Sequence, residues 1–103
     1  MSVFESPDLA DVFNASYVTT QIVATSVASE AKVGVTRLSK RQLILLTNTS
    51  SSIVYFGPSG VTTSTGVPLR KDELISLPFG ENIAVFLICA PTESATVTVQ
   101  EIS

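Results

Sequence analysis

The 103-residue sequence contains no histidine and no tryptophan. Without histidine, the chain has no Ser–His or Cys–His dyad, no imidazole base and none of the usual nitrogen ligands of zinc. Its carboxylates are scattered and form no Asp-x-Asp-x-Asp-Gly calcium loop. The glycine-punctuated stretch 57–66 lacks the Gly-Lys-Ser/Thr ending of a phosphate-binding loop. We therefore expect no enzyme activity, metal, cofactor or small-molecule substrate.

Charge and cysteine are also scarce. Charged residues make up only 15% of the chain, against roughly 25% in typical soluble domains, which suggests that a partner covers part of the surface. The net charge of −3 argues against nucleic-acid binding, because that function requires a basic patch. The single cysteine, Cys89, excludes an intramolecular disulfide and lies in the apolar run 83–90. We expect it to be a small buried hydrophobic residue rather than a reactive thiol.

Signals for secretion or membrane insertion are missing as well. Glu5, Asp8 and Asp11 stand where a signal peptide would carry a basic region and an apolar core. The longest apolar runs have about eight residues, well below the roughly 20 that a membrane helix needs. We therefore expect synthesis in the cytoplasm, no secretion and no membrane partner.

Residues 1–16 are predicted to form an N-terminal arm that is distinct from a β-sandwich domain at 17–103. Ser6-Pro7-Asp8 is a helix-start signature with a side-chain cap, a proline and an acid at the positive end of the dipole. Three apolar residues follow at helical spacing: Leu9, Val12 and Phe13. This pattern predicts one short helix near residues 7–13, which must dock because so short a helix is marginal alone. It can dock on its own module or on a neighbour.

Strand-favouring runs separated by turn signals occupy the rest of the chain. The predicted strands are 17–23, 43–46, 53–56, 74–79, 83–90 and 95–100. Residues 26–32 favour a loop or a second short strand, and 33–36 are compatible with a return to the strand. The polar cluster 48–52 predicts a turn that joins 43–46 and 53–56 as an antiparallel hairpin. The fold class is therefore all-β: a single antiparallel β-sandwich or flattened barrel of six to eight strands.

Hydrophobic alternation separates the last strand from three others. Residues 95–100 alternate cleanly, with Ala95, Val97 and Val99 inward. The runs at 43–46, 53–56 and 83–88 do not alternate, so both of their faces are expected to be covered. The predicted core is Leu43, Leu45, Ile53, Tyr55, Ile75, Leu77, Val85, Leu87, Val97 and Val99. We expect a homo-oligomer or a bound subunit, held by the arm and by these uncharged strand faces.

Two connecting segments have a distinctive composition. The basic segment 37–41 is predicted to be a solvated turn before a strand, with contact to an acidic patch on a partner as the alternative. The stretch 57–69 reads as a turn followed by a long, exposed loop rich in hydroxyl side chains.

Residues 41–101 contain a series of motifs that is shared with other small β-modules. The series is Arg41-Gln42-Leu43-Ile44-Leu45-Leu46, Asn48-Thr49-Ser50, Ile53-Val54-Tyr55-Phe56-Gly57, Gly60-Val61-Thr62-Thr63-Ser64-Thr65-Gly66-Val67-Pro68-Leu69 and Ala95-Thr96-Val97-Thr98-Val99. In this order the segments resemble a module common in tailed-bacteriophage structural proteins. The amino-acid sequence of the loop 60–69 is the most specific part of the resemblance. Arg70-Lys71-Asp72-Glu73 departs from the glycine-containing turn that is usual at its place.

The resemblance implies a non-enzymatic virion component, with the major capsid protein and further copies of the chain as partners. The expected role is capsid decoration, in which a cement protein stabilises the head. A neck, tail, baseplate or fibre subunit is an alternative, and a carbohydrate- or receptor-binding module that uses Tyr17 or Tyr55 is a third. The candidate interface residues are Phe4, Leu9, Val12 and Phe13 in the arm, and Val61, Thr62, Thr63, Ser64 and Thr65 in the loop as a polar rim.

Overall fold

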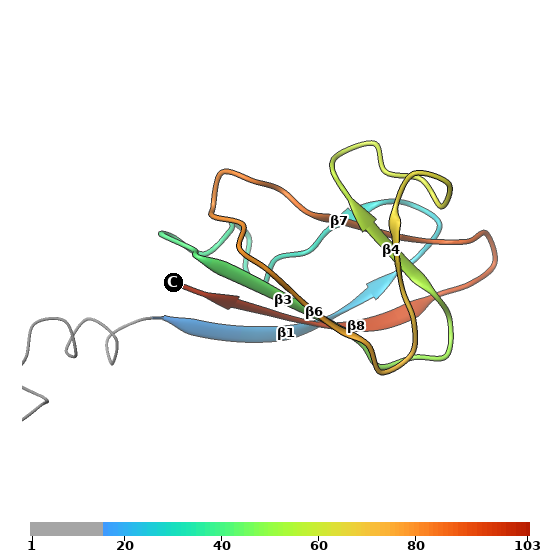
Figure 1. The fold of residues 1–103 in the computed structure, drawn as a ribbon, viewed down its shortest axis with the longest axis horizontal. Helices are drawn as coiled ribbons and strands as arrows, with labels where there is room; N and C mark the ends of the chain where they lie inside the picture. Colours follow the sequence, from blue (N-terminus) through green and yellow to red (C-terminus); the bar gives the residue numbers. More distant parts are fainter. Residues whose placement is uncertain (1–15) are drawn as a thin grey trace, which may run out of the picture.

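Two antiparallel sheets of four strands each make up residues 16–103, the part of the chain that the computed structural model describes (Figure 1). The strands are β1 (Tyr17–Ala24), β2 (Ser29–Glu30), β3 (Leu43–Asn48), β4 (Val54–Gly57), β5 (Val67–Leu69), β6 (Leu74–Leu77), β7 (Phe86–Cys89) and β8 (Ala95–Ile102). The predicted all-β sandwich of six to eight strands is confirmed. The predicted helix near 7–13 lies outside the described residues. Within those residues no helix is long and apolar enough to cross a membrane.

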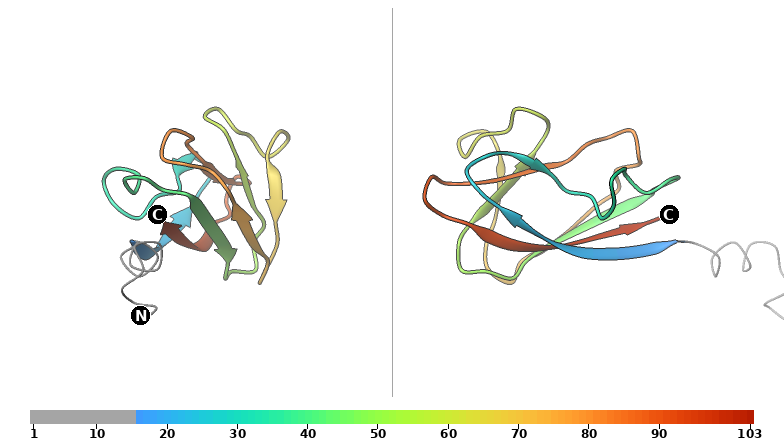
Figure 2. Two further views of the ribbon diagram at one scale, coloured as in Figure 1. Left: turned by 60° about the vertical axis from the view of Figure 1, so that its left-hand side comes forward. Right: turned by 180° about the vertical axis from the view of Figure 1, so that it is seen from behind.

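The strand order is β1-β8-β3-β6 in the first sheet, here sheet A, and β2-β7-β4-β5 in the second, sheet B. The two sheets pack on each other, with β1 and β8 side by side along one side of the sandwich (Figure 2). All neighbouring strands within a sheet run antiparallel. The core therefore lies between the inner faces of the two sheets.

The predicted hairpin between β3 and β4 is wrong, because these strands belong to different sheets. The buried Asn48 at the end of β3 turns the chain from sheet A to sheet B. Its amide Nδ2 donates to the carbonyls of Ser52 at 2.7 Å and Leu69 at 2.9 Å, and its Oδ1 accepts from the Ser50 N–H at 2.9 Å. A side chain thus satisfies backbone groups that have left the ladder, which an ordinary hairpin turn would not require.

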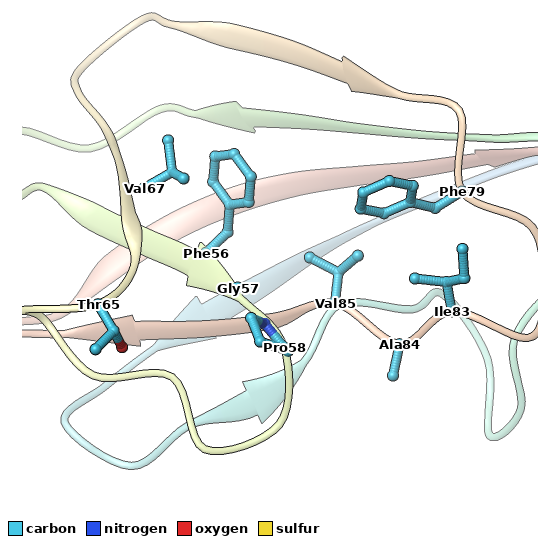
Figure 3. A pocket seen from close by; sticks show the side chains of 9 residues that line it. All are labelled: Phe56, Gly57, Pro58, Thr65, Val67, Phe79, Ile83, Ala84 and Val85. Atoms are coloured by element: carbon cyan, nitrogen blue, oxygen red, sulfur yellow. The ribbon is translucent and has the colours of Figure 1, made fainter.

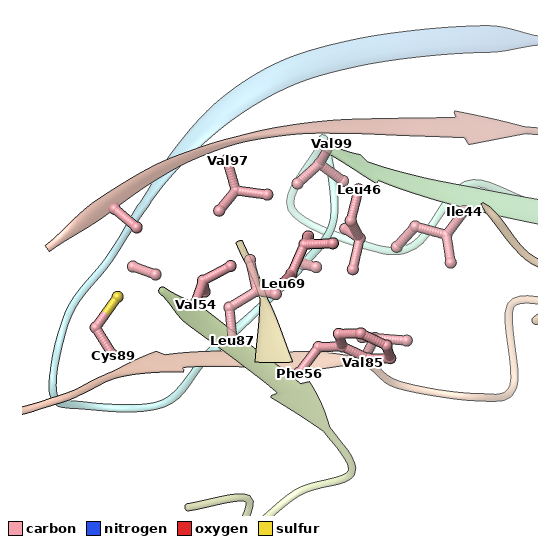
Figure 4. Close-up of a cluster of buried hydrophobic side chains, with 13 residues drawn as sticks. Ile44, Leu46, Val54, Phe56, Leu69, Val85, Leu87, Cys89, Val97 and Val99 are labelled. Carbon is pink, nitrogen blue, oxygen red and sulfur yellow. The ribbon is translucent and has the colours of Figure 1, made fainter. Parts of the chain in front are cut away.

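The core is a single cluster of inward-facing apolar side chains from both sheets (Figure 4). Its members are Ala24, Ala31, Ile44, Leu46, Val54, Phe56, Leu69, Val85, Leu87, Cys89, Ala95, Val97 and Val99. The predicted core residues Val85, Leu87, Val97 and Val99 are confirmed as buried, and Ile75 and Leu77 pack against the cluster as partly buried residues. Cys89 is buried as predicted.

The predicted faces of β3 and the β4 region are wrong. Ile44 and Leu46 point inward in place of Leu43 and Leu45, and Val54 and Phe56 point inward in place of Ile53 and Tyr55. In a run that is apolar at every position, a shift of one residue still buries apolar side chains, so the pattern cannot select the face. The choice is made by pairing with β8, whose inward Val99 lies opposite Leu46.

Several predicted segments differ in extent. Residues 33–36 do not resume a strand, β6 ends at Leu77 rather than at residue 79, and β7 begins at Phe86 rather than at residue 83. Residues 67–69 of the predicted loop form β5, whereas β2 is the second short strand that was one of the two predictions for 26–32. The shorter β7 follows from the neighbouring turn, in which the Ile83 N–H donates to the Gly80 carbonyl at 3.1 Å.

A buried ion pair closes one end of the sandwich. The guanidinium of Arg41 lies 2.7 Å from the carboxylate of Glu101 at the end of β8, and both side chains are almost completely buried. Arg41 also donates to the carbonyls of Phe79, Gly80 and Ile83, at 3.0, 2.9 and 2.6 Å. The prediction of a solvated basic turn is therefore wrong for Arg41.

Glu101 completes this cluster, here called the Arg41–Glu101 clamp. Its carboxylate accepts from the backbone N–H groups of Val33 at 2.8 Å and Leu38 at 3.2 Å. The clamp thus fastens the loop 31–42 and the segment 79–83 to the last strand. One signal could have found it, because extending the alternation of Ala95, Val97 and Val99 by two positions places Glu101 inward.

Candidate partner-binding surface

Within residues 16–103, the strand positions on the outer face of sheet A carry no charged residue. On β8 the inward residues are buried, so Thr96, Thr98, Gln100 and Ile102 point outward. The register places outward residues of the other three strands beside them. The resulting rows are Tyr17, Ile102 and Leu43; Thr19, Gln100, Leu45 and Ser76; Gln21, Thr98, Thr47 and Leu74; and Val23 beside Thr96.

Charged residues of the described chain lie elsewhere. Apart from Glu30 in β2 and the buried Glu101, they are all in the loops that connect the strands. Sheet A thus offers hydroxyl, amide and hydrocarbon groups across its whole outer face. The cores of protein interfaces are depleted of charge in the same way, because a charge is costly to take out of water.

Large apolar side chains are most exposed at the two edges of this face. Tyr17 and Val23 on β1 are 59% and 60% exposed, and Leu74 on β6 is 59% exposed. The hydroxyl of Tyr17 accepts a hydrogen bond from the side-chain amide of Gln100 on β8. This bond holds the phenol ring at the edge of the face, where it can contact a partner. The sequence pointed to uncharged strand faces but missed the Thr/Gln-rich contributions of β1 and β8, which their alternation and lack of charge could have indicated.

The predicted interface residues of the loop, 61–65, differ in exposure to solvent. Val61 is only 4% exposed. A Cβ added at Gly57 would lie 2.8 Å from its Cγ2, and one added at Gly66 would lie 2.9 Å from it. Both glycines therefore leave room for Val61 to pack against its own hairpin near Tyr55. Its side chain is covered by the chain itself.

The hydroxyls of the same loop act mainly inside it. The Thr62 N–H donates to the Thr65 hydroxyl at 2.9 Å, the two hydroxyls are 3.1 Å apart, and Ser64 N–H donates to the Thr62 hydroxyl at 3.2 Å. Thr62, Ser64 and Thr65 are exposed and Thr63 is half-buried. The predicted arm residues Phe4, Leu9, Val12 and Phe13 lie outside the described part of the chain.

An apolar groove of about 300 Å³ lies at one end of the sandwich, between the β4–β5 hairpin and the segment that leads into β7 (Figure 3). It is lined by Phe56, Gly57, Pro58, Thr65, Val67, Phe79, Ile83, Ala84 and Val85. Thr65 is the only lining residue with a polar side-chain atom. Ligand sites usually combine an apolar wall with a few convergent polar groups, and among the described residues only Thr65 offers a polar side chain to this groove. It can accept an apolar side chain.

Other reactive groups in residues 16–103 are sparse. This part of the chain contains no cluster of three or more His, Cys, Asp or Glu side chains that could hold a metal ion. Burial raises the pKa of the Cys89 thiol, and the nearby Glu93 carboxylate raises it further. The thiol is therefore kept protonated and poorly nucleophilic near neutral pH.

The fold and this surface define an eight-stranded antiparallel β-sandwich with one uncharged sheet face. A comparison of the chain with protein-family models, curated proteins and solved structures finds no match. The outer face of sheet A and the sequence motifs of residues 41–101 are therefore the features that indicate a function.

Proposed function

We propose that this chain is a non-enzymatic structural subunit of a tailed-bacteriophage virion, and that it acts as a capsid decoration protein. In this role the outer face of sheet A binds the major capsid protein and stabilises the head. The observation that carries the proposal is the absence of charge across that entire face. The resemblance of residues 41–101 to phage structural modules supports the choice of partner.

The uncharged composition of this face suits a stable interface. A stable interface buries about 800 Å² on each partner, and each Å² of apolar surface contributes about 25 cal/mol before the costs of association. The Thr and Gln side chains add hydrogen-bonding groups whose desolvation costs much less than that of Lys or Glu. Such a face suits a subunit that binds once and stays in place.

The proposal is tested by placing a charge at the centre of the face. Thr98 lies on β8 between Gln21 and Thr47, with its side chain outward, so Thr98→Lys leaves the core intact. Ser51→Lys makes the same change of charge in an exposed turn and is the matched control. We expect Thr98→Lys to lose co-sedimentation with heads that lack the protein, whereas Ser51→Lys binds like the unmodified chain.

Copy number separates decoration from other positions in the virion. Counting the protein in purified particles by quantitative mass spectrometry is expected to give copies in proportion to the capsid lattice. A count that matches a single ring would contradict decoration and favour a neck or tail subunit. Equal binding by Thr98→Lys and Ser51→Lys would contradict the role of the sheet A face.

A further inference from the structure

The four edge strands of the sandwich differ in how they are protected against pairing with another strand. β2 has only two residues and carries Glu30, and β5 has three residues with Pro68 in the middle. β6 has four residues, and Pro78 follows it directly. Short length, charge and proline are the usual ways in which proteins prevent edge-to-edge pairing.

β1 has none of these protections. It is eight residues long, it forms the free edge of sheet A, and its sequence Tyr-Val-Thr-Thr-Gln-Ile-Val-Ala contains no charge, proline or glycine. It lies along the outside of the sandwich next to β8 (Figures 1 and 2). Within residues 16–103, no segment other than β8 hydrogen-bonds to its backbone.

The hydrogen bonds at the end of β1 show which backbone groups face the free edge. The Ser16 carbonyl accepts from the Ser103 N–H at 2.9 Å. The backbone N–H and C=O groups of Ser16 and of every second residue after it therefore point toward β8. The N–H and C=O groups that point away from β8 therefore belong to Tyr17, Thr19, Gln21 and Val23. These groups form a regular template for one more antiparallel strand.

We propose that β1 pairs with β1 of a second copy of this chain, antiparallel and about a two-fold axis at Thr20, so that the two A sheets become one continuous sheet. In this register the edge-facing groups of the four odd-numbered residues exchange about eight hydrogen bonds. The cross-strand neighbours are Tyr17 with the partner's Val23, Thr19 with the partner's Gln21, Val18 with the partner's Ile22, and Thr20 with the partner's Thr20.

These neighbours suit one another. Aromatic with β-branched, β-branched with β-branched, and Thr with Thr are stabilising cross-strand pairs. Opposite residues in an antiparallel pair lie on the same face, so Tyr17 and Thr19 stay on the outer face of the joined sheet and Val18 stays on the inner face. Two-fold pairing brings each strand against its own copy, which would repel if β1 carried a charge.

A second copy can meet β1 along its whole length, because its own β1 carries the same edge-facing N–H and C=O groups. The Ser16 N–H donates to the Ser103 hydroxyl at 2.8 Å, and the Ser16 carbonyl accepts from the Ser103 N–H. Both bonds keep the backbone extended at the start of β1. Pairing between copies does not depend on the proposed virion role, and it would double the uncharged face of sheet A.

The mass of the full-length protein in solution tests the pairing. We expect light scattering at micromolar concentration to give twice the chain mass of 10.9 kDa. Gln21→Pro removes an edge-facing N–H without touching the β8 ladder, so this variant is expected to be monomeric with the far-UV spectrum unchanged. A monomeric unmodified chain, or a dimeric Gln21→Pro variant, would overturn the proposal.

Ser76→Pro is the matched control on the opposite edge of sheet A. The Asn48 N–H donates to the Glu73 carbonyl at 3.2 Å, so the odd-numbered residues of β6 face β3 and the Ser76 N–H faces away. The same substitution therefore removes an edge-facing N–H in both variants. Ser76→Pro is expected to remain a dimer, and loss of the dimer in both variants would refute the assignment to β1.

A disulfide cross-link tests the register even if a proline variant fails to fold. Opposite residues of a hydrogen-bonded antiparallel pair have Cα atoms about 5.5 Å apart, which matches the geometry of a disulfide. The double variant Thr19→Cys/Gln21→Cys is expected to form a covalent dimer on mild oxidation, whereas Thr19→Cys alone is not, because Thr19 does not lie opposite itself. The reverse result would rule out this register.

Amide hydrogen exchange identifies a different occupant of the edge. In the dimer, the amides of Tyr17, Thr19, Gln21 and Val23 are expected to become protected as the protein concentration rises. Protection of these amides in a protein that stays monomeric would show that another part of the same chain covers β1, and would overturn pairing between copies.

Discussion

The Arg41–Glu101 clamp allows the sharpest test of how the sandwich is held together. Replacing Arg41 by Met keeps most of the hydrocarbon stem and removes the guanidinium. The change leaves the Glu101 carboxylate buried without its cation and removes hydrogen bonds to the Phe79, Gly80 and Ile83 carbonyls. Breaking one side of a buried ion pair costs about 3–5 kcal/mol, which is a large part of the 5–15 kcal/mol stability of an ordinary domain.

Arg37→Met is the matched control for this change. Arg37 pairs with Glu30 at the same 2.7 Å, but the Arg37 side chain is 33% exposed, so its loss is expected to cost less than about 1 kcal/mol. The free energies of unfolding are measured by urea denaturation followed by far-UV circular dichroism, with equal denaturant slopes as the check on two-state unfolding. If Arg41→Met and Arg37→Met are equally stable, the clamp does not hold the sandwich together.

The double variant Arg41→Met/Glu101→Leu tests which lost interactions account for the destabilisation by Arg41→Met. Replacing a whole buried ion pair by hydrocarbon is often neutral, because no buried charge is left unpaired. Here the backbone N–H groups of Val33 and Leu38 would still lose their acceptor. We therefore expect the double variant to remain less stable than the unmodified chain, and full recovery would show that these backbone bonds contribute little.

Three further predictions concern single side chains. In the same urea assay, Leu46→Ala is expected to lower the free energy of unfolding by about 2–5 kcal/mol and Leu45→Ala by clearly less, because only Leu46 lies in the core. The opposite order would mean that the inward face of β3 is misassigned. Thr92→Gly is expected to raise stability by about 1 kcal/mol, because a β-branched residue is strained at the Thr92 φ of 67°; an unchanged melting temperature would argue against this strain. Cys89 is expected to react with a thiol reagent only when the protein unfolds, and rapid labelling of the native protein at pH 7 would contradict its burial. Because folding raises the pKa of the Cys89 thiol, the stability that the buried, protonated thiol contributes is present at neutral pH and is lost as the pH rises through that pKa.

The local pattern predicted β8 best. Val97 and Val99 alternate with threonines, and a strand with one buried and one solvated face has only one register that hides its apolar set. β3 shows the opposite case, because its run of Leu and Ile offers apolar side chains to both faces. The sequence therefore predicted the strand but could not select its inward face.

The candidate surface was predictable only in part. Low charge indicated a covered surface, and the outer face of sheet A is uncharged in every row. That face brings together β1 and β8 from opposite ends of the chain with β3 and β6 from its middle. Val61 shows the same limit, because a loop residue that looks exposed in sequence is buried by contacts near Gly57 and Gly66.

Composition and periodicity by themselves determined that this chain forms an all-β sandwich with few charges, because strand propensity and alternation are properties of neighbouring residues. The tertiary structure alone decided that β3 and β4 separate into two sheets, that Arg41 meets Glu101 inside the protein, and that β1 is an edge strand of sheet A within residues 16–103. Each of these features depends on contacts between residues far apart in the sequence. Local patterns cannot encode such contacts, since the same strand can lie at the edge or in the centre of a sheet according to what packs beside it.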